Sequence, residues 1–172
     1  MKASITLGID IGTTGTKVVA FDAADGRLTA VNRSVTANAD GPGIAEADPR
    51  EWIENTISAI ADLLAHHQLD ARRVAAISTT GMVPAVLLLG DDGMPLRRAI
   101  LQSDARAVDE IAQVADYLEP FSPVETTGSA VSQQSVAPTL LWLQKHEPEI
   151  WSRTRVVVGG YDWILMHLGG RP

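Results

Sequence analysis

Apolar residues occupy every second position between 5 and 11, which is the period of a strand with one face on a core. Apolar residues resume at 18–21, so residues 12–17 are expected to connect two strands. Asp25-Gly26 is a strong turn signal, and residues 28–36 return to a β-like pattern. The chain is therefore predicted to begin with a three-stranded meander.

The pattern changes to helical spacing after the loop Gly41-Pro42-Gly43. Asp48-Pro49 provides a capping acid and a proline at the first helical position, and Glu51 is placed to reach back toward the cap. Apolar residues then recur at helical intervals from Trp52 onward. We expect a helix that ends near residue 66 and packs on the sheet.

Shorter elements follow in alternation. The predicted strands are residues 74–78, which are expected to be buried, 83–89 and 155–158, with an extended segment at 95–101. The predicted helices are residues 105–118, 137–146 and 162–168. Paired strands followed by alternating strands and helices predict an α/β domain with a mixed sheet.

Composition narrows the classes of function without naming one. The 172 residues are enough for one domain with a sizeable core, and 45% of them are apolar. A net charge of −7 without a basic stripe argues against general nucleic-acid binding. Because no apolar run is long enough for a membrane span and no signal-peptide layout is present, we expect no membrane partner and a cytoplasmic location. The absence of cysteine excludes disulfides and thiolate metal sites, and a homodimer is left open.

Chemistry-bearing side chains gather around the predicted connection at 12–17. Gly12 and Gly15 permit a positive φ and a close approach of the backbone to a ligand, which leaves N–H and hydroxyl donors facing a phosphate. Asp10 lies just before the connection, and a carboxylate beside a phosphate indicates a cation between them, here a water-coordinated Mg²⁺. The alternative is an ordinary glycine hairpin with surface threonines.

The best-known phosphate motifs do not fit this segment. A Walker A loop needs a glycine directly before the lysine and a helix after it, but Thr16 precedes Lys17 and β-rich sequence follows. The GxGxxG fingerprint of dinucleotide-binding proteins is also missing. Residues 8–22 instead resemble the first phosphate motif of the actin, hexokinase and Hsp70 ATPase superfamily. The wording DIGTTGTK at 10–17 resembles the FGGY carbohydrate kinases in particular.

Four later segments resemble the same family in the same order. They are residues 46–52, which open the first helix; 100–106, similar to ILWxDxR; 137–149, similar to APKLLWL followed by HEPE; and 156–170, similar to a segment ending in DY(I/L) and LTG. The resemblance implies an actin-like ATPase (ribonuclease H-like) fold and ATP-dependent phosphorylation of a sugar or polyol hydroxyl, as in xylulokinase. It further implies that Asp10 positions Mg²⁺ through water. The residues implied around the phosphates of ATP are Gly12, Thr13, Thr14 and Lys17.

The positions expected to contact the sugar depart from the xylulose-type pattern. Thr80-Gly81-Met82-Val83-Pro84 stands where that subgroup has SGQMH, Gln102 replaces the tryptophan of ILWxDxR, and Thr139 replaces the lysine of APKLLW. Met82 alternatively belongs to the core. Asp104 alternatively caps a helix beginning at Ala105, which places Arg106 in an exposed first turn. The candidate substrate residues are Gly81, Met82, Gln102, Asp104 and Arg106.

A general base is not recognised in the chain. In the family that the chain resembles, the catalytic aspartate, the adenosine pocket and the closing half of the cleft belong to a second actin-like domain. We therefore expect residues 1–172 to be the N-terminal domain of a kinase, with the C-terminal domain absent from the chain and the isolated chain inactive. The alternatives are a non-catalytic actin-like binding or regulatory module, and another member of the superfamily, such as a glucokinase-type sugar kinase or an acetate-kinase-like enzyme.

Overall fold

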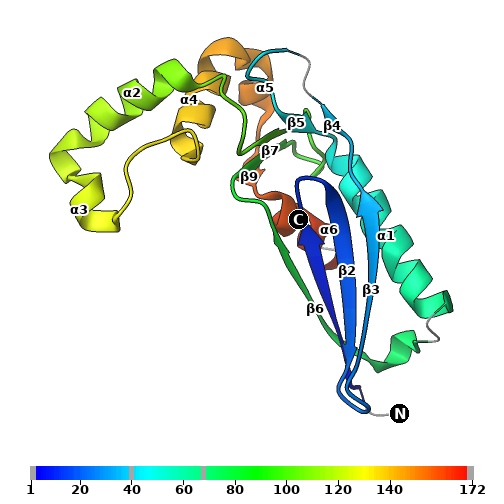
Figure 1. The fold of residues 1–172 in the computed structure, drawn as a ribbon. Helices are drawn as coiled ribbons and strands as arrows, with labels where there is room; N and C mark the ends of the chain where they lie inside the picture. The colour runs from blue at the N-terminus through cyan, green and yellow to red at the C-terminus, as the bar shows by residue number, and fades with distance from the viewer. Residues whose placement is uncertain (1–2, 39–40, 67–68, 170–172) are drawn as a thin grey trace. The chain divides into compact units, whose positions relative to one another are not determined.

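The computed structural model describes residues 3–38, 41–66 and 69–169 (Figure 1). These residues divide into two compact units. Unit 1 comprises Met1–Ala37, Asp48–Met82 and Gly160–Pro172, and unit 2 comprises Asn38–Ala47 and Val83–Gly159. Gly170, the last residue of the family-like segment at 156–170, lies outside the described residues.

Unit 1 contains a four-stranded mixed sheet in the order β3-β2-β1-β6 (Figure 1). Strands β1 (Ile5–Ile11), β2 (Gly15–Asp22) and β3 (Arg27–Ser34) form the predicted meander with antiparallel pairing. Strand β6 (Val74–Gly81) pairs with β1 in parallel. The predicted meander and the predicted mixed sheet are both confirmed.

The connection between β1 and β2 is shorter than predicted, because β2 begins at Gly15 and includes Thr16 and Lys17. Neither Gly12 nor Gly15 has a positive φ, so the conformation that glycine permits is not used at either position. What requires glycine at position 15 is space, because a Cβ there would lie 2.6 Å from the carbonyl oxygen of Arg33 on β3. The neighbouring strand, rather than the turn conformation, therefore explains this glycine.

Helices α1 (Pro49–His66) and α6 (Gly160–Gly169) pack on one face of this sheet. The alternation along β1 and β2 buries every second side chain against them. Trp52 of α1 and Trp163 of α6 are also buried. A Cβ on Gly160 would lie 2.9 Å from the Trp52 ring, so glycine allows α6 to approach α1 closely. The remaining side chains of β1 and most of those of β2 point to the opposite, exposed face.

Two local expectations in unit 1 are wrong. Glu51 does not reach back to the helix cap; its carboxylate accepts hydrogen bonds from the N–H and hydroxyl of Thr36, at 3.0 and 3.1 Å. Asp48 does behave as a capping acid, since its Oδ1 accepts the Arg50 N–H at 2.9 Å.

The strand predicted at 74–78 exists as part of β6 but is largely exposed. It is exposed because β6 is at one edge of the described sheet.

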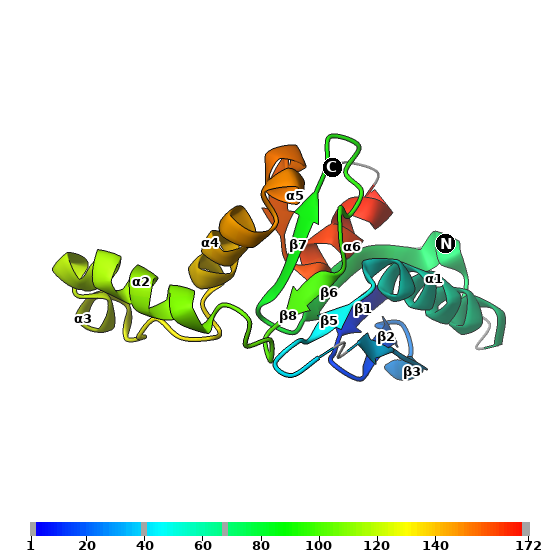
Figure 2. The ribbon, with the colours of Figure 1, turned by 90° about the horizontal axis from the view of Figure 1, so that it is seen from above.

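A second sheet has short strands in the order β4-β5-β8-β7-β9, all of which belong to unit 2 except Ala37 of β4. Their bounds are β4 (Ala37–Asn38), β5 (Glu46–Ala47), β7 (Ala85–Leu89), β8 (Ala99–Leu101) and β9 (Val156–Val158). All of β7 is buried, and Val86 and Leu88 form a core with Ile100 and Leu143. The helices α4 (Val136–His146) and α5 (Pro148–Arg153) cover this core (Figure 2).

The remaining helices are α2 (Val108–Leu118), α3 (Pro123–Thr127) and two single turns of 3₁₀ helix, η1 (Ala71–Arg73) in unit 1 and η2 (Glu119–Phe121) in unit 2. Helix α2 starts three residues later than predicted, because residues 104–106 form a turn instead. The short helices α3 and α5 have no counterpart in the sequence prediction. In the ranges that the structure describes, no helix is both long and apolar enough to cross a membrane.

Candidate functional site

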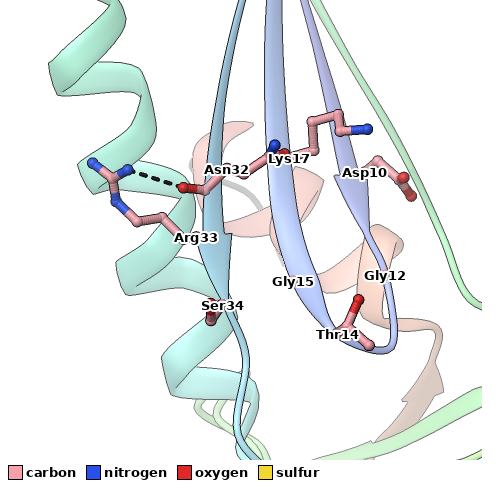
Figure 3. A pocket seen from close by; sticks show the side chains of 8 residues that line it. All are labelled: Asp10, Gly12, Thr14, Gly15, Lys17, Asn32, Arg33 and Ser34. Atoms are coloured by element: carbon pink, nitrogen blue, oxygen red, sulfur yellow. Dashed lines mark hydrogen bonds between the residues drawn. The ribbon is translucent and has the colours of Figure 1, made fainter.

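A pocket of about 350 Å³ lies beside the β1–β2 turn of unit 1 (Figure 3). Its lining residues are Asp10, Gly12, Thr14, Gly15, Lys17, Asn32, Arg33 and Ser34. Four of the predicted phosphate- and metal-binding residues therefore come together here, and Thr13 alone of that set is not among the described lining residues. Strand β3 contributes three lining residues that the sequence analysis did not single out.

The pairing of the strands explains why distant residues meet in this pocket. Asp10 on β1 lies directly opposite Lys17 on β2, and Lys17 lies directly opposite Asn32 on β3. All three side chains are on the exposed face of the sheet. The residues on either side of each one along its strand are more buried, as the alternation of a strand requires. The row Asp10–Lys17–Asn32 therefore runs across three adjacent strands. Figure 3 shows Lys17 extending toward Asp10, with Asn32 beside it.

Two backbone groups of the turn are already hydrogen-bonded. The N–H of Gly12 donates to the carbonyl oxygen of Gly15 at 2.9 Å, and the Thr14 carbonyl accepts the N–H of Val35 at 3.1 Å. The expected free backbone donor at Gly12 is therefore not available. Side chains and the other N–H groups of the turn, rather than the Gly12 N–H, are left to meet a ligand.

The charged groups that line the pocket differ in whether they already have a partner. Within the described part of the chain, Asp10 and Lys17 make no hydrogen bond or ion pair with another side chain. The guanidinium of Arg33 is turned away toward α1 (Figure 3), where it pairs with Asp62 and with the Ser58 hydroxyl at 3.3 Å. Arg33 therefore lines the pocket without presenting its charge to it, and Lys17 is the cation that faces the pocket.

The donor set at this turn fits Mg²⁺ in one particular way. Across residues 3–38, 41–66 and 69–169, no group of three or more histidine or acidic side chains converges as a metal site. Mg²⁺ is commonly held by one or two carboxylates together with substrate phosphates and waters. The exposed carboxylate of Asp10 beside a pocket of about 350 Å³ matches that arrangement.

The candidate substrate residues fall in both units. Gly81 and Met82 belong to unit 1, whereas Gln102, Asp104 and Arg106 belong to unit 2. A Cβ on Gly81 would lie 2.9 Å from the carbonyl oxygen of Ile11, and the Met82 N–H donates to that same oxygen at 2.9 Å. Close packing against β1 therefore accounts for glycine at position 81. Met82 is half-buried, and Gln102, just after β8, is half-buried as well.

Asp104 and Arg106 form a buried ion pair. Asp104 Oδ1 accepts the backbone N–H and the Nε of Arg106 at 3.0 and 2.8 Å, and Oδ2 accepts from the Ala45 N–H and an Arg106 terminal nitrogen, both at 2.7 Å. These bonds use about all the lone pairs of a carboxylate. Because the Arg106 side chain is only 7% exposed, the alternative that places it in an exposed first turn of a helix is wrong. Asp104 is also not the cap of α2, whose N-cap residue is Ala107.

Further groups extend this ion pair. Arg106 donates to Glu46 at 2.7 Å and lies 5.1 Å from the centre of the Trp142 ring, and Arg97 pairs with the same Glu46. Burial acts to raise the pKa of Asp104, but the hydrogen bonds from Arg106 and Ala45 outweigh it and the pKa is lowered. Burial likewise acts to lower the pKa of Arg106, whereas its bonds to Asp104 and Glu46 raise it. Both groups are therefore held in their charged forms.

A cavity beside Asp104 is too small for a sugar. It measures about 10 Å³ and is lined by Asp104, Ala105, Ala107, Val108, Ile111, Gln133, Pro138 and Thr139. That volume holds about one water molecule. The described residues of unit 2 do not by themselves form a sugar-sized pocket at this point.

The sequence analysis missed partners in both regions. Asn32 could have been found by counting residues in both directions from the Asp25-Gly26 turn, because the register of the hairpin places Asn32 opposite Lys17. Glu46 and Trp142 could not have been found in this way. They reach Arg106 only through the folding of unit 2, across long sequence separations.

Comparisons with known proteins agree with this fold. Residues 5–171 match the family described as "FGGY family of carbohydrate kinases, N-terminal domain". A xylulose kinase from Staphylococcus epidermidis is 32% identical over 165 residues, which are 95% of this chain and 32% of that protein. The chain therefore spans about a third of the length of the curated relatives it matches.

Solved structures give the same result. A xylulose kinase from Rhodospirillum rubrum has a TM-score of 0.84 at 35% identity, over 94% of this chain and 33% of that one. A xyloylose kinase from Brucella ovis has a TM-score of 0.86 at 30% identity, over 94% of this chain and 34% of that one. The predicted fold class, an α/β fold of the actin-like ATPase type, is confirmed by these similarities.

Proposed function

The chain belongs to the FGGY family of carbohydrate kinases, and from this premise we propose that it supplies the phosphate-binding part of an ATP-dependent sugar or polyol kinase. One observation carries the proposal. Asp10 and Lys17 lie opposite each other on an exposed sheet face, beside a pocket of about 350 Å³, without a partner in the described chain. A phosphate with a bound metal ion requires a carboxylate for the metal and a cation for the phosphate oxygens. Asp10 and Lys17 provide these two groups at a glycine turn.

The proposed mechanism assigns different tasks to these residues. Phosphoryl transfer requires little covalent chemistry from the protein, so catalysis depends on alignment and on neutralising charge. Lys17 binds phosphate oxygens, and the hydroxyls of Thr13 and Thr14 donate hydrogen bonds at the turn. Asp10 would hold Mg²⁺ through water, and the ion, when bound there, would supply positive charge against the phosphate oxygens. Gly12 keeps the turn narrow, since its Cβ would lie 3.1 Å from the Gly15 carbonyl oxygen.

We propose a pentulose such as xylulose as the acceptor, because the relatives described above are xylulose kinases. Gly81, Met82, Gln102 and Arg106 are kept as proposed sugar contacts. Asp104 is given a different task, because its lone pairs are already used and it holds Arg106 in place. The terminal nitrogen of Arg106 that bonds neither Asp104 nor Glu46 is the group proposed to reach a sugar oxygen.

The general base and the adenosine pocket are proposed to lie outside residues 1–172, in a second domain of a longer kinase. The support is that the chain covers about a third of its relatives and that the family model it matches describes an N-terminal domain. On this view, residues 1–172 form the N-terminal domain. The cytoplasm, where ATP and free sugars occur, is the proposed compartment.

A thermal-shift screen of the full chain tests this function. The ligands are a nonhydrolysable ATP analogue with Mg²⁺, alone and together with a panel of pentuloses, polyols and hexuloses. We expect a Tm increase of about a few degrees with the nucleotide and a further increase with one sugar class, because a ligand that binds only the folded state stabilises it. No shift with any combination would overturn the proposal. Sugar-dependent ATP turnover by this chain alone would instead contradict the location proposed for the base.

A further inference from the structure

We propose that Asn32 is a phosphate-binding residue of the same site, with its side-chain amide donating a hydrogen bond to a phosphate oxygen that Lys17 also binds. The inference rests on the proposed function. Neither the glycine motif nor the family-like segments include Asn32, which lies 15 positions beyond Lys17 in the sequence. The fold brings the two residues together.

The geometry places Asn32 in the wall of the pocket. It lies on β3, the edge strand next to β2, directly opposite Lys17 in the antiparallel register. Side chains directly opposite each other on one sheet face have Cβ atoms about 5 Å apart, which is close enough for both to contact one phosphate group. Asn32 lines the pocket and points toward Lys17 (Figure 3).

The side chain of Asn32 is also available for a ligand. It is exposed, and within the described residues its amide has no hydrogen-bond partner. The neighbouring Arg33 differs, because its guanidinium is occupied by Asp62 and Ser58 on α1. Of these two adjacent residues, only Asn32 has side-chain donors free for the pocket.

Charge explains why a neutral donor suits this position. Lys17 already has the carboxylate of Asp10 on the side of β1. A second carboxylate on the side of β3 would repel a phosphate, whereas an amide offers two N–H donors and no charge. The row of Asp10, Lys17 and Asn32 therefore presents a metal-binding acid, a cation and a neutral donor in sequence across the sheet.

The test measures binding of inorganic tripolyphosphate with Mg²⁺ to the full chain by NMR titration. This probe contains the phosphates without the adenosine, whose pocket is proposed to lie elsewhere. We expect Asn32→Ala to weaken binding by about tenfold, as for loss of one hydrogen bond to a charged group. Asn32→Asp is expected to weaken binding by more than tenfold, because it also adds repulsion.

The matched control is Ala30→Asp, which adds the same charge on the same face of β3 but outside the pocket lining. We expect a smaller loss from it than from Asn32→Asp. Because both positions are exposed, the amide spectrum of each variant should remain that of a folded chain. If the original chain binds tripolyphosphate and Asn32→Ala binds it equally well, the inference is overturned while the phosphate site stands. If the original chain does not bind the probe, the proposed function and this inference both fail.

Discussion

At the scale of single residues, the face of the sheet decides what an acidic side chain does. Asp22 lies on the buried face of β2 and accepts hydrogen bonds from the Ala24 N–H at 3.0 Å, from the Ser4 hydroxyl at 2.9 Å and from Arg73 at 2.6 Å. Asp10 lies on the exposed face of β1, where solvent compensates its charge. A buried carboxylate requires such partners, whereas an exposed one remains free to bind a cation. Only the second arrangement is useful for a ligand.

A buried hydroxyl near the pocket gives a stability prediction at this scale. Thr16 is fully buried, and its Oγ1 has no hydrogen-bond partner within the described residues. We expect Thr16→Val to increase the free energy of unfolding by about 1 kcal/mol, because an apolar methyl replaces an unpaired hydroxyl. Chemical denaturation measures the change.

Thr56→Val is the matched control for that substitution. Thr56 is also fully buried, but its Oγ1 donates to the Trp52 carbonyl oxygen at 2.8 Å. This substitution is expected to lower the free energy of unfolding by about 1 kcal/mol. A loss of stability in both variants would show that the Thr16 hydroxyl has a partner in solution.

At the scale of elements, the close contact of β2 with β3 keeps the pocket residues of these two strands side by side. Gly15 begins β2, and Arg33 on β3 has its carbonyl oxygen where a Cβ of residue 15 would lie. We expect Gly15→Ala to lower the free energy of unfolding by about 1 to 3 kcal/mol, because the strands must separate to fit the methyl group. Weaker binding of phosphate should accompany the loss.

The control for that element is Gly8→Ala. Gly8 is on β1 of the same sheet, and a Cβ there would meet no atom within 4 Å. This variant is expected to be neutral or slightly stabilising, because alanine restricts the unfolded chain. Thermal unfolding of both variants gives the comparison, and equal losses would show that the packing at Gly15 is not what matters.

The elements also show why sequence predicts some features and not others. The period of two placed the strands of the meander, and with it Asp10 on the face opposite the core. The register of the hairpin also determines the position of Asn32, although the sequence analysis did not use it. The surroundings of Asp104 and Arg106 depend on Glu46, 60 positions from Arg106, and on the Trp142 ring. No local sequence pattern encodes such a contact, so the partners of Asp104 and Arg106 could be identified only from the structure.

At the scale of the whole molecule, three aspartates predict sensitivity to acid. The pKa values of Asp22, Asp70 and Asp104 all lie below the ordinary 3.8. The leading cause is a backbone N–H bond from Ala24 for Asp22 and from Arg72 for Asp70. For Asp104, bonds from Arg106 and Ala45 outweigh the opposing effect of burial. A lowered pKa in the folded state means that the ionised form stabilises the fold.

The predicted pH dependence of stability follows from the lowered pKa values of these aspartates. The stabilisation is present above pH 3.8, the ordinary value, and is lost as the pH falls through the lower values of the folded chain. We expect Tm to fall below that pH. Asp104→Asn should have a lower Tm than the original chain at neutral pH, and the gap should narrow in acid. A gap that stays constant between neutral pH and pH 2.5 would contradict the ionised role of Asp104.

The share of its relatives' length that the chain covers determines which part of the proposed function can be tested with it. It matches the N-terminal domain of a kinase family and about a third of the length of its relatives. The sheet face proposed to bind phosphate lies in unit 1, and the residues proposed to contact the sugar are divided between the two units. Binding of the phosphates of a nucleotide is therefore the part of the proposed function that can be tested with residues 1–172.

The most direct test of the central claim is an NMR titration of the full chain with a nonhydrolysable ATP analogue and Mg²⁺. We predict amide shifts concentrated at Gly12 to Lys17 and at Asn32 to Ser34. Lys17→Met should weaken binding by at least about tenfold. Arg27→Met, which removes the same charge at the far end of β3, should leave binding unchanged. Shifts elsewhere, or equal binding by Lys17→Met, would contradict the claim that this turn holds the phosphates.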